Sequence, residues 1–477
     1  MRLFEISEEA RSTGVENKHV NGITADSREF SAGNIFVCIK GENFDSHTLA
    51  KDMLEKGAAA VITERDLNLK GQIIVPNTRK YYAKLSSAYF GNPTERLKLV
   101  AATGTNGKST IIAMIKHILE TAGCKTGSVG TVGYDTAGKM YEAHLTVPYQ
   151  FELYRLFGEM ADNGAEYCVI EASSQALSQN RFADEIFECA IFTNLTQDHL
   201  DWHKTMENYY LSKRSLFDMT KSAVVNKDNK YGEKLIKYIK SEKSIPLVTY
   251  SANDIADCYA VNIKSSASGV SYWFSSQLEE QSFPLKLSMP GLYNAANSIG
   301  AISVCVNLGI SIGDAVNALS SFKGVKGRSE LIYSGDFTVI CDYAHTEDAL
   351  TKFLSDVKKL TQGRVICVFG APGERDVMKR PLMGEAVDKQ ADYIIVTSDN
   401  PRFESQESII EQVIKGIKDT PYDTYTDRRK AIEAALKMAE KGDIIALCGK
   451  GHETYQVIGD EYLHFDEREI VLNAVTV

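Results

Sequence analysis

One short segment constrains the fold more than any other, because a strand, a glycine-containing loop and a helix follow one another directly. The apolar run LKLVAAT leads into Gly104-Thr105-Asn106-Gly107-Lys108-Ser109-Thr110 and then into the amphipathic stretch IIAMIKHILETAG. Backbone N–H groups at such a helix start can hold phosphate oxygens, with Lys108 near the β and γ phosphates and Ser109 directed at Mg²⁺. The generic motif has glycine where this chain has Ala102. The context favours a nucleoside triphosphate site over a glycine-rich turn beside a surface lysine.

Length, charge and cysteine usage exclude several classes of protein. The chain has 477 residues, and at roughly 100 to 200 residues per domain we expect two to four domains. A net charge of -10 disfavours a nucleic-acid partner. The acidic start and the absence of a long uncharged apolar run predict a cytoplasmic chain without membrane insertion. Nine cysteines without a CxxC pair fit reduced core thiols better than disulfides or a zinc site.

The alternation of strand-like and helix-like runs predicts an α/β protein of three domains, with limits at 1–88, 89–323 and 324–477. We expect a small open α/β domain first, then a central parallel-sheet domain that begins with the glycine-containing loop. Residues 246–290 alternate like antiparallel hairpins, which predicts a small β-insert at the end of the central domain. The last domain is predicted to have a Rossmann-like, doubly wound sheet.

Four strand-like runs in the last domain, FTVICDYAH, RVICVFGAPG, YIIVTSDNP and DIIALCGKG, all end in polar or glycine-containing turns. If these strands are parallel, the turns gather at one sheet edge, where open α/β sheets bind ligands. This edge would bring together Arg375, Asp399, Asn400, Arg402, Gly449 and Glu453. Two arginines could bind carboxylates and Glu453 an ammonium group, so the edge suits a zwitterion. Ordinary loop salt bridges explain the same residues equally well.

Acidic residues and histidines follow two strand-like runs of the central domain. Glu171 ends the run YCVIE, where a carboxylate could hold the Mg²⁺ of a bound nucleotide. The segment LTQDHLDWH offers Asp198, His199, Asp201 and His203. Such density suggests metal or proton-transfer chemistry, although surface loops also collect these residues by chance.

Taken in order, the motifs of this chain resemble those of the Mur ligases, ATP-dependent amide-forming enzymes of cytoplasmic peptidoglycan precursor synthesis, and most closely the tripeptide-forming members. The resemblance spans essentially the whole chain. It rests on ADSR with GNIFVCIKG, TGTNGKST, EASSQAL with Arg181, FTNLTQDHLDWH, Lys213 in NYYLSKRSLF, MPGLYNAAN, GRSE, DYAHTEDAL, GERD with KRPLMGE, DNPR and GKGHE.

This resemblance implies four groups of binding residues. Near the UDP group it places Ser27, Glu42, Asn43 and Phe44. Around the muramoyl peptide it places Thr146, Val147, Ser173, Gln179 and Arg181. ATP would contact the loop from Gly104 to Thr110 together with Asn294, Arg328 and Asp342. The amino acid would bind at Arg375, Asp399, Asn400, Pro401, Arg402, Gly449 and Glu453.

The resemblance also implies the cofactors and the reaction. Two Mg²⁺ ions are expected, one at Ser109 and Glu171, the other at His199 and Lys213, the latter as an N-carboxylated (carbamate) lysine. A substrate carboxylate would attack the γ-phosphate of ATP, and an amine would then displace phosphate from the acyl phosphate. Lys108, Glu171, His199 and Lys213 are the expected catalytic residues. Because the last domain carries a separate site, we expect it to close over the central one. We expect a monomer whose partners are small molecules.

The arginine of DNPR indicates which amino acid is added. In this family it accompanies meso-diaminopimelate, whose second carboxylate needs a cation, so Arg402 favours adding that compound to the D-glutamyl residue of UDP-N-acetylmuramoyl-L-alanyl-D-glutamate. Departures from the usual motifs, Gln175, Val147 and Glu347, leave open a divergent paralogue or the use of L-lysine or lanthionine. Three other classes remain: a folylpolyglutamate synthetase-like ligase, a P-loop kinase, and a catalytically silent nucleotide-binding protein.

Overall fold

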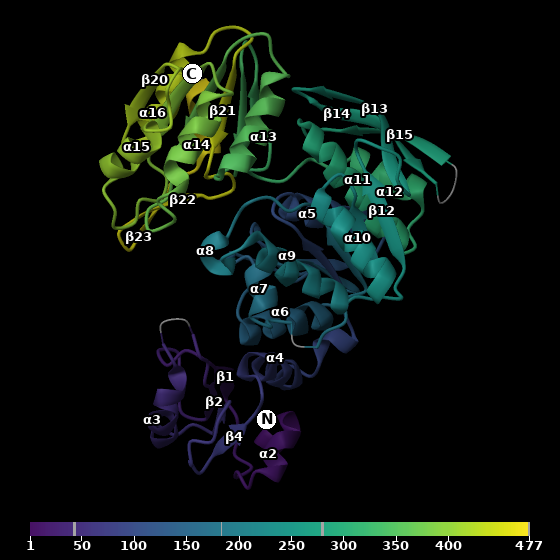
Figure 1. The fold of residues 1–477 in the computed structure, drawn as a ribbon, viewed down its shortest axis with the longest axis vertical. Helices are drawn as coiled ribbons and strands as arrows, with labels where there is room; N and C mark the ends of the chain where they lie inside the picture. The colour runs from purple at the N-terminus through teal and green to yellow at the C-terminus, as the bar shows by residue number, and fades with distance from the viewer. Residues whose placement is uncertain (42–43, 183, 278–280, 476–477) are drawn as a thin grey trace.

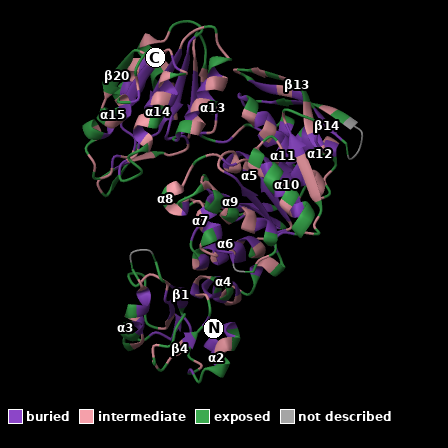
Figure 2. Cartoon of the chain, viewed as in Figure 1, coloured by how far each residue is buried: buried purple, intermediate pink, exposed green. Residues whose placement is uncertain are grey.

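The computed structural model describes residues 1–41, 44–182, 184–277 and 281–475. Three large β-sheets, each with its own helices, follow one another along the chain and form three lobes of the molecule (Figure 1). The inner strands of each sheet are buried, whereas edge strands such as Tyr422–Tyr425 are exposed, and many exposed residues lie on helices and loops (Figure 2). The α/β fold class predicted from the sequence is therefore confirmed.

The first sheet has four parallel strands in the order β1-β2-β3-β4. Its strands form where short runs such as AVIT are buried over their whole length. Asn77 starts the long helix of this domain, because its side chain accepts a hydrogen bond from the Lys80 N–H. The elements are β1 (Gly22–Thr24), β2 (Asn34–Val37), β3 (Ala60–Thr63), β4 (Gln72–Ile74), α1 (Leu3–Ile6), α2 (Glu8–Ser12), η1 (Ser46–Leu49), α3 (Ala50–Glu55) and α4 (Thr78–Tyr89).

The central sheet has eleven strands in the order β15-β14-β13-β12-β11-β10-β5-β9-β6-β7-β8. Strands β10, β5, β9 and β6 are parallel, so their carboxyl ends meet at one edge. The strands are β5 (Lys98–Thr103), β6 (Thr126–Gly130), β7 (Gly133–Asp135), β8 (Met140–Tyr141), β9 (Tyr167–Glu171), β10 (Cys189–Phe192), β11 (Ala223–Asn226), β12 (Leu247–Ser251), β13 (Cys258–Ser266), β14 (Gly269–Ser276) and β15 (Gln281–Leu287).

The antiparallel segment predicted at 246–290 is present as β13, β14 and β15. These strands continue the central sheet, since β13 pairs with β12 in parallel through Tyr250 and Cys258. The predicted β-insert is thus an extension of the sheet edge.

Helices cover both faces of the central sheet. Side chains of α5, α11 and α12 form one core with the sheet, and those of α6, α9 and α10 form the core on the opposite face. The helices are η2 (Pro93–Glu95), α5 (Lys108–Thr121), α6 (Gln150–Asp162), α7 (Ser174–Ser178), α8 (Leu200–His203), α9 (Met206–Arg214), η3 (Ser215–Asp218), α10 (Lys230–Glu242), α11 (Leu292–Asn307) and α12 (Ile312–Ser320).

The third sheet has the order β16-β17-β21-β18-β19-β20. The four strands predicted from apolar runs are β17, β21, β18 and β19, and they are parallel as expected. Helices α13, α14 and α15 pack on one face, α16 and α17 on the other. The elements are β16 (Glu330–Ser334), β17 (Thr338–Asp342), β18 (Val365–Phe369), β19 (Tyr393–Thr397), β20 (Tyr422–Tyr425), β21 (Ile444–Cys448), β22 (Tyr455–Ile458), β23 (Glu461–His464), α13 (Glu347–Lys358), α14 (Lys379–Asp388), α15 (Gln406–Ile414), α16 (Arg428–Met438) and α17 (Glu467–Val475).

Eight of the nine cysteines are buried and Cys124 is half-buried, in agreement with the prediction of core thiols. Across the described ranges, no helix combines the length and apolar character needed to cross a bilayer.

Candidate functional site

The loop between β5 and α5 has the geometry of a phosphate-binding turn. Gly104 and Gly107 have φ angles of +151° and +86°, which favour glycine. A Cβ on Gly104 would lie 1.9 Å from the Thr193 hydroxyl oxygen, and one on Gly107 would lie 2.5 Å from Asn297 Oδ1. Ala102, which departs from the generic motif, is a buried residue inside β5. The tight turn therefore starts at Gly104, and Ala102 packs in the hydrophobic core.

Two lysines donate to the same carbonyl oxygen of this loop. Lys108 Nζ donates to Gly104 O (3.0 Å) and Thr105 O (2.8 Å), and Lys213 Nζ donates to Gly104 O (2.8 Å). Burial lowers the pKa of Lys108, while Glu171 and Asp198 oppose this shift. Burial and the nearby Lys108 lower the pKa of Lys213 well below its usual value. The site thus favours an uncharged amine at Lys213, which lies behind the loop rather than on the cavity wall.

Glu171 ends β9 and is buried next to the loop. Its carboxylate accepts hydrogen bonds from the Thr131 N–H (2.8 Å) and the Thr131 hydroxyl (3.3 Å). Gly130 allows this approach, because a Cβ there would lie 2.5 Å from Glu171 Oε1. Thr131, which sequence reasoning missed, therefore orients the carboxylate. The only indication in the sequence that Thr131 belongs to the site is its position after a strand end, in the run GTVG.

The segment 195–203 lies beside the phosphate loop. His199 has a φ of +53° and starts α8, and its Nε2 lies 3.4 Å from Asp198 Oδ2. Burial and Lys108 lower the pKa of His199 to about 4, although Asp198 opposes them. The imidazole is therefore neutral near pH 7 and free to act as a ligand. His203 is instead buried, with its Nε2 2.9 Å from the Ser174 hydroxyl, so its role is packing.

Donors suited to Mg²⁺ face one cavity from three elements. The Ser109 hydroxyl, the Glu171 carboxylate and the His199 ring all line it. Oxygen ligands suit Mg²⁺, whereas the Lys213 amine has no oxygen and does not line the cavity. Within the described ranges no group of three or more His, Cys, Asp or Glu side chains is placed to hold a metal. The donors that line the cavity therefore fit Mg²⁺ that completes its ligands with substrate or water oxygens, rather than a closed protein cage.

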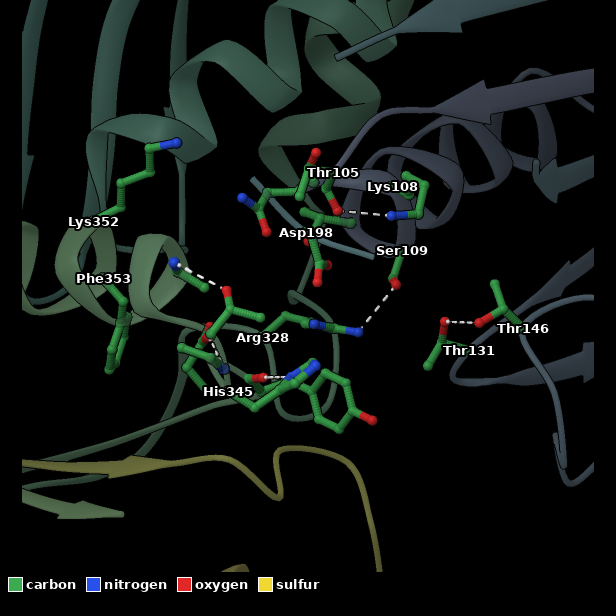
Figure 3. A pocket seen from close by; sticks show the side chains of 18 of the residues that line it. Thr105, Lys108, Ser109, Thr131, Thr146, Asp198, Arg328, His345, Lys352 and Phe353 are labelled. Atoms are coloured by element: carbon green, nitrogen blue, oxygen red, sulfur yellow. Dashed lines mark hydrogen bonds between the residues drawn. The ribbon is translucent and has the colours of Figure 1, made fainter. Parts of the chain in front are cut away.

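The cavity has a volume of about 840 Å³ and lies between the central and last domains. Figure 3 shows Lys108 and Ser109 on one side and His345, Lys352 and Phe353 of the last domain on the other. Arg328 spans the two sides, donating from Nη2 to the Ser109 hydroxyl (3.2 Å) (Figure 3). Its guanidinium also stacks over the Tyr343 ring, 4.5 Å from the centroid.

Two of the residues implied for ATP have their polar atoms engaged within the protein. Asp342 accepts from the Ser329 and Ala344 N–H groups at 2.7 and 2.8 Å, and burial raises its pKa although Arg328 opposes this. Asn294 donates to Pro290 O and accepts from Asn297 Nδ2. Asn297, not Asn294, lines the cavity, and Asp342 lines it too. Sequence reasoning missed Asn297, although it lies in the same run, MPGLYNAAN.

Residues implied for the muramoyl peptide form one connected group. Arg181 is buried, stacks over the Tyr149 ring at 4.5 Å, and donates to the Val147 carbonyl. It also donates to Gln179 Oε1 at 2.9 Å. The Val147 side chain packs in the central core. Ser173 starts α7, and it lines the cavity together with Thr146, Val147, Arg181 and Gln175. The structure therefore brings these predicted residues together, with Gln179 behind them.

The residues implied for the UDP group lie apart from this cavity. Ser27 and Phe44 are exposed on the first domain. Glu42 and Asn43 lie outside the described residues. Asp26 lies next to Ser27 and pairs with Arg28. The Arg28 guanidinium is the main cause of the lowered pKa of the Asp26 carboxyl.

The carboxyl edge of the third sheet carries the predicted amino-acid group. Arg375, Asp399, Asn400, Arg402, Gly449 and Glu453 all line the cavity, whereas Pro401 lies behind it. Arg402 has a φ of +54°, and backbone hydrogen bonds to Val457 O (3.1 Å) and from Gly459 N (2.8 Å) fix it. Lys450, which sequence reasoning missed, is buried below Asn400 and Glu453 and donates to each at 3.0 Å.

Direct contacts also link the two sides of the cavity. Asp348 of α13 accepts from Asn106 Nδ2 (2.9 Å) and from the Thr196 hydroxyl (2.8 Å). Lys379 of α14 donates to Asp198 Oδ1 at 2.9 Å. Burial opposes ionisation of Asp198, but His199 and Lys379 outweigh it and lower its pKa to about 2. Motif reading could not find Asp348 and Lys379 as contacts, because their partners lie more than a hundred residues away in the chain.

Three family models cover most of the chain. The Mur ligase family, catalytic domain, matches residues 19–102, the Mur ligase middle domain matches 102–305, and the Mur ligase, glutamate ligase domain, matches 327–451.

Curated relatives match over almost the full length. UDP-N-acetylmuramoyl-L-alanyl-D-glutamate--2,6-diaminopimelate ligase 1 of Clostridium acetobutylicum is 41% identical over 95% of this chain and 94% of its own. The UDP-N-acetylmuramoyl-L-alanyl-D-glutamate--2,6-diaminopimelate ligase of Caldanaerobacter subterraneus subsp. tengcongensis is 42% identical over 99% of this chain and 98% of its own.

Solved structures agree with this match. A structure of a UDP-N-acetylmuramoyl-L-alanyl-D-glutamate--2,6-diaminopimelate ligase superposes with a TM-score of 0.69 at 30% identity, covering 96% of this chain and 95% of its own. A folylpolyglutamate synthase of Mycobacterium tuberculosis shares the fold, with a TM-score of 0.64 at 14% identity, over 78% of this chain and 91% of its own. From the full-length matches and the phosphate loop that faces the third domain across one cavity, we conclude that the chain belongs to the Mur ligase family.

Proposed function

We propose that this Mur ligase joins meso-2,6-diaminopimelate to the D-glutamyl carboxylate of UDP-N-acetylmuramoyl-L-alanyl-D-glutamate, with ATP as co-substrate and ADP and phosphate as products. One observation carries the proposal: a single cavity has the phosphate loop on one side and the Asn400, Arg402 and Glu453 edge on the other. The names of the full-length relatives point to the same reaction.

We assign one substrate to each of three domains, with limits at 1–88, 89–323 and 324–477. The first would bind the uridine nucleotide near Ser27 and the segment 42–44. The central domain would bind ATP at its phosphate loop. The last would bind the amino acid at the carboxyl edge of its sheet, as open α/β sheets commonly do. Ser27 and Phe44 support this division, because both are exposed and neither lines the cavity.

The first chemical step brings two anions together. An oxygen of the glutamyl carboxylate attacks the γ-phosphorus of ATP, the bond to the β-phosphate oxygen breaks, and ADP leaves an acyl phosphate. Lys108 would move from the carbonyls of Gly104 and Thr105 to the phosphates and neutralise charge there. Ser109 and Glu171 would hold one Mg²⁺, and His199 with carboxylated Lys213 a second; when bound, these ions would supply further charge neutralisation.

Lys213 is suited to become a carbamate. The uncharged amine attacks the carbon of CO₂ and releases one proton to solvent, so that the neutral side chain becomes an anion with two oxygen atoms. Burial and Lys108, which lower the pKa of Lys213, favour the reactive amine. The new negative charge would then lie beside the Lys108 ammonium, where it is stabilised.

The second step needs a correctly oriented amine. The free amine nitrogen attacks the acyl carbon, phosphate leaves, and the nitrogen loses a proton to give the amide. Arg402 and Arg375 would bind the carboxylates of the amino acid, and Glu453 an ammonium group. A bidentate contact between Arg402 and the second carboxylate would discriminate against L-lysine, which has no group to fill it.

One alternative has specific support. Gln175 lines the peptide side of the cavity, so a related muramoyl peptide or another diamino acid stays a second candidate. The folylpolyglutamate synthase of Mycobacterium tuberculosis shares only the fold, at 14% identity over 78% of this chain, and lends no support to a folylpolyglutamate-forming reaction. Val147 adds little to the first alternative, because its side chain is buried in the core.

Phosphate release tests the proposal. The full chain is assayed with ATP, Mg²⁺ and UDP-N-acetylmuramoyl-L-alanyl-D-glutamate, in parallel with meso-diaminopimelate and with L-lysine, and the product mass is recorded. We expect release and a tripeptide product with diaminopimelate alone. Preference for lysine would keep the ligase class and remove the argument from Arg402. Absence of phosphate release with both amino acids would indicate a different muramoyl substrate.

A further inference from the structure

A buried lysine lies at the centre of the amino-acid edge and takes no part in the mechanism described above. Lys450 follows β21, and its residue exposure is 0%. Burying an ammonium group is costly unless anions and hydrogen-bond acceptors surround it. Lys450 lies directly below residues that line the cavity, so its burial indicates a function at this edge.

Lys450 joins the turns that follow two strands. Its Nζ donates to Asn400 Oδ1 and Glu453 Oε2, each at 3.0 Å, and lies 3.5 Å from Asp399 Oδ1. Asn400 Nδ2 donates to the same Glu453 oxygen at 2.9 Å. Asn400, Glu453 and Lys450 thus form a closed triangle of hydrogen bonds between the turn after β19 and the turn after β21.

This triangle divides the two oxygens of Glu453 between the protein and the cavity. Oε2 accepts from both Lys450 and Asn400. Oε1 accepts no hydrogen bond from the described residues, and Glu453 lines the cavity. One carboxylate oxygen is therefore fixed and the other is available to a ligand.

Lys450 also sets the charge of the edge. Asp399 and Glu453 carry two negative charges, and Lys450 cancels one of them. Arg428 and Glu467, which form a buried pair at 2.8 Å below the same turns, cancel each other. Glu453 keeps a free carboxylate oxygen that suits one ammonium group of a ligand, whereas Arg375 and Arg402 of the same edge suit carboxylates.

We propose that Lys450 is a positioning residue for the amino-acid substrate: it holds Glu453 and Asn400 so that Glu453 Oε1 stays available in the cavity for a substrate ammonium group. This inference rests on the proposed function, because it takes the amino acid to bind at this edge. Lys450 acts through Glu453 and Asn400 and touches no reacting atom.

A full-length Lys450→Met variant tests the proposal, with Lys450→Arg as the conservative variant. Steady-state kinetics give kcat and the KM for meso-diaminopimelate, ATP and the muramoyl dipeptide separately. Acyl-phosphate formation without any amino acid is followed by borohydride trapping. Arg364→Met is the matched control, because it removes a cation paired with Asp443 at 2.7 Å, at the opposite edge of the same sheet.

We expect Lys450→Met to raise the KM for diaminopimelate at least tenfold, because Glu453 and Asn400 lose the donor that holds them. The KM for ATP and the trapped acyl phosphate should stay within about twofold. Lys450→Arg should recover part of the loss, and Arg364→Met should change none of these values.

Two results overturn the inference alone: an unchanged KM for diaminopimelate in Lys450→Met, or equal losses of acyl-phosphate trapping and amide formation, which a merely structural role predicts. A wild-type chain that forms acyl phosphate but accepts no diamino acid overturns both the inference and the proposed function.

Discussion

Two lysines are buried on opposite sides of the cavity, and their surroundings differ. Lys213, 1% exposed, donates to the Gly104 carbonyl, which Lys108 shares. Lys450, 0% exposed, donates to the side chains of Asn400 and Glu453 and lies near Asp399. Burial and a second cation disfavour the charge of Lys213, whereas carboxylates compensate that of Lys450. The comparison teaches that the partners of a buried lysine, rather than its burial, decide whether it can serve as a reactive amine or as a fixed cation.

The largest effect is expected on the phosphate side of this comparison. Lys108→Met should lower ATP- and Mg²⁺-dependent phosphate release by ~10³-fold, because it removes a preorganised charge at the transferred phosphate. A coupled phosphate assay measures the loss. Lys125→Met, an exposed lysine beyond the end of α5, should retain full activity. Equal activity of the two variants would exclude Lys108 from the reaction.

The second prediction separates the two buried lysines by their chemistry. Lys213→Gln should lower kcat by about 10²-fold or more, because a neutral amide cannot replace a negatively charged oxygen ligand. With ¹³C-labelled bicarbonate, the wild-type chain should show a carbamate resonance that this variant lacks, and Lys450→Met should keep it. A wild-type enzyme that is insensitive to CO₂ removal and shows no such resonance would rule out the carbamate.

A smaller effect is expected for the arginine on the amino-acid side. Arg402→Lys should raise the KM for meso-diaminopimelate about 10- to 100-fold, since a lysine loses the bidentate contact with a carboxylate. The preference over L-lysine should fall in parallel, and competition between the two amino acids measures it. Arg429→Lys, an exposed residue of α16, is the control. A preserved preference in Arg402→Lys would place the second carboxylate elsewhere.

The smallest effect concerns His452, which lies between the two sides and packs against the Tyr343 ring at 5.1 Å. Burial, with Arg328, lowers its pKa to about 4. The unfolded chain therefore binds a proton more readily, so this contribution to stability is present above pH ~6.5 and is lost as the pH falls toward 4. After allowance for solvent screening we expect a loss of about 1 to 2 kcal/mol.

Chemical denaturation between pH 4 and 7.5 checks this value. The free energy of unfolding of the wild type should fall toward pH 4 more steeply than that of His452→Gln. Parallel curves for the two proteins would show that His452 is protonated as easily in the folded state as in the unfolded state.

Much of the fold and part of the site could be predicted from local patterns. The run from Lys98 to Thr121 forms the predicted strand, turn and helix, and the four apolar runs of the last domain form parallel strands. Local patterns failed where distant residues meet. The interpretation of residues 246–290 as an insert missed that β13 pairs with β12, a pairing that depends on tertiary packing. Asn297 could not be preferred over Asn294, because both lie on one helix and only packing against Gly107 separates them.

The sequence by itself determined the positions of the phosphate loop and of the strand ends, because turn glycines and apolar runs act within a few residues of chain. Only the tertiary structure decided which side chains share a cavity and which charges are compensated. Asp348 meets Asn106, and Lys379 meets Asp198, across the two domains. Lys213 and Lys450 look alike in the sequence as single lysines within motifs. Their different chemistry comes from neighbours that folding supplies, because electrostatic effects depend on distance in space and on burial rather than on separation along the chain.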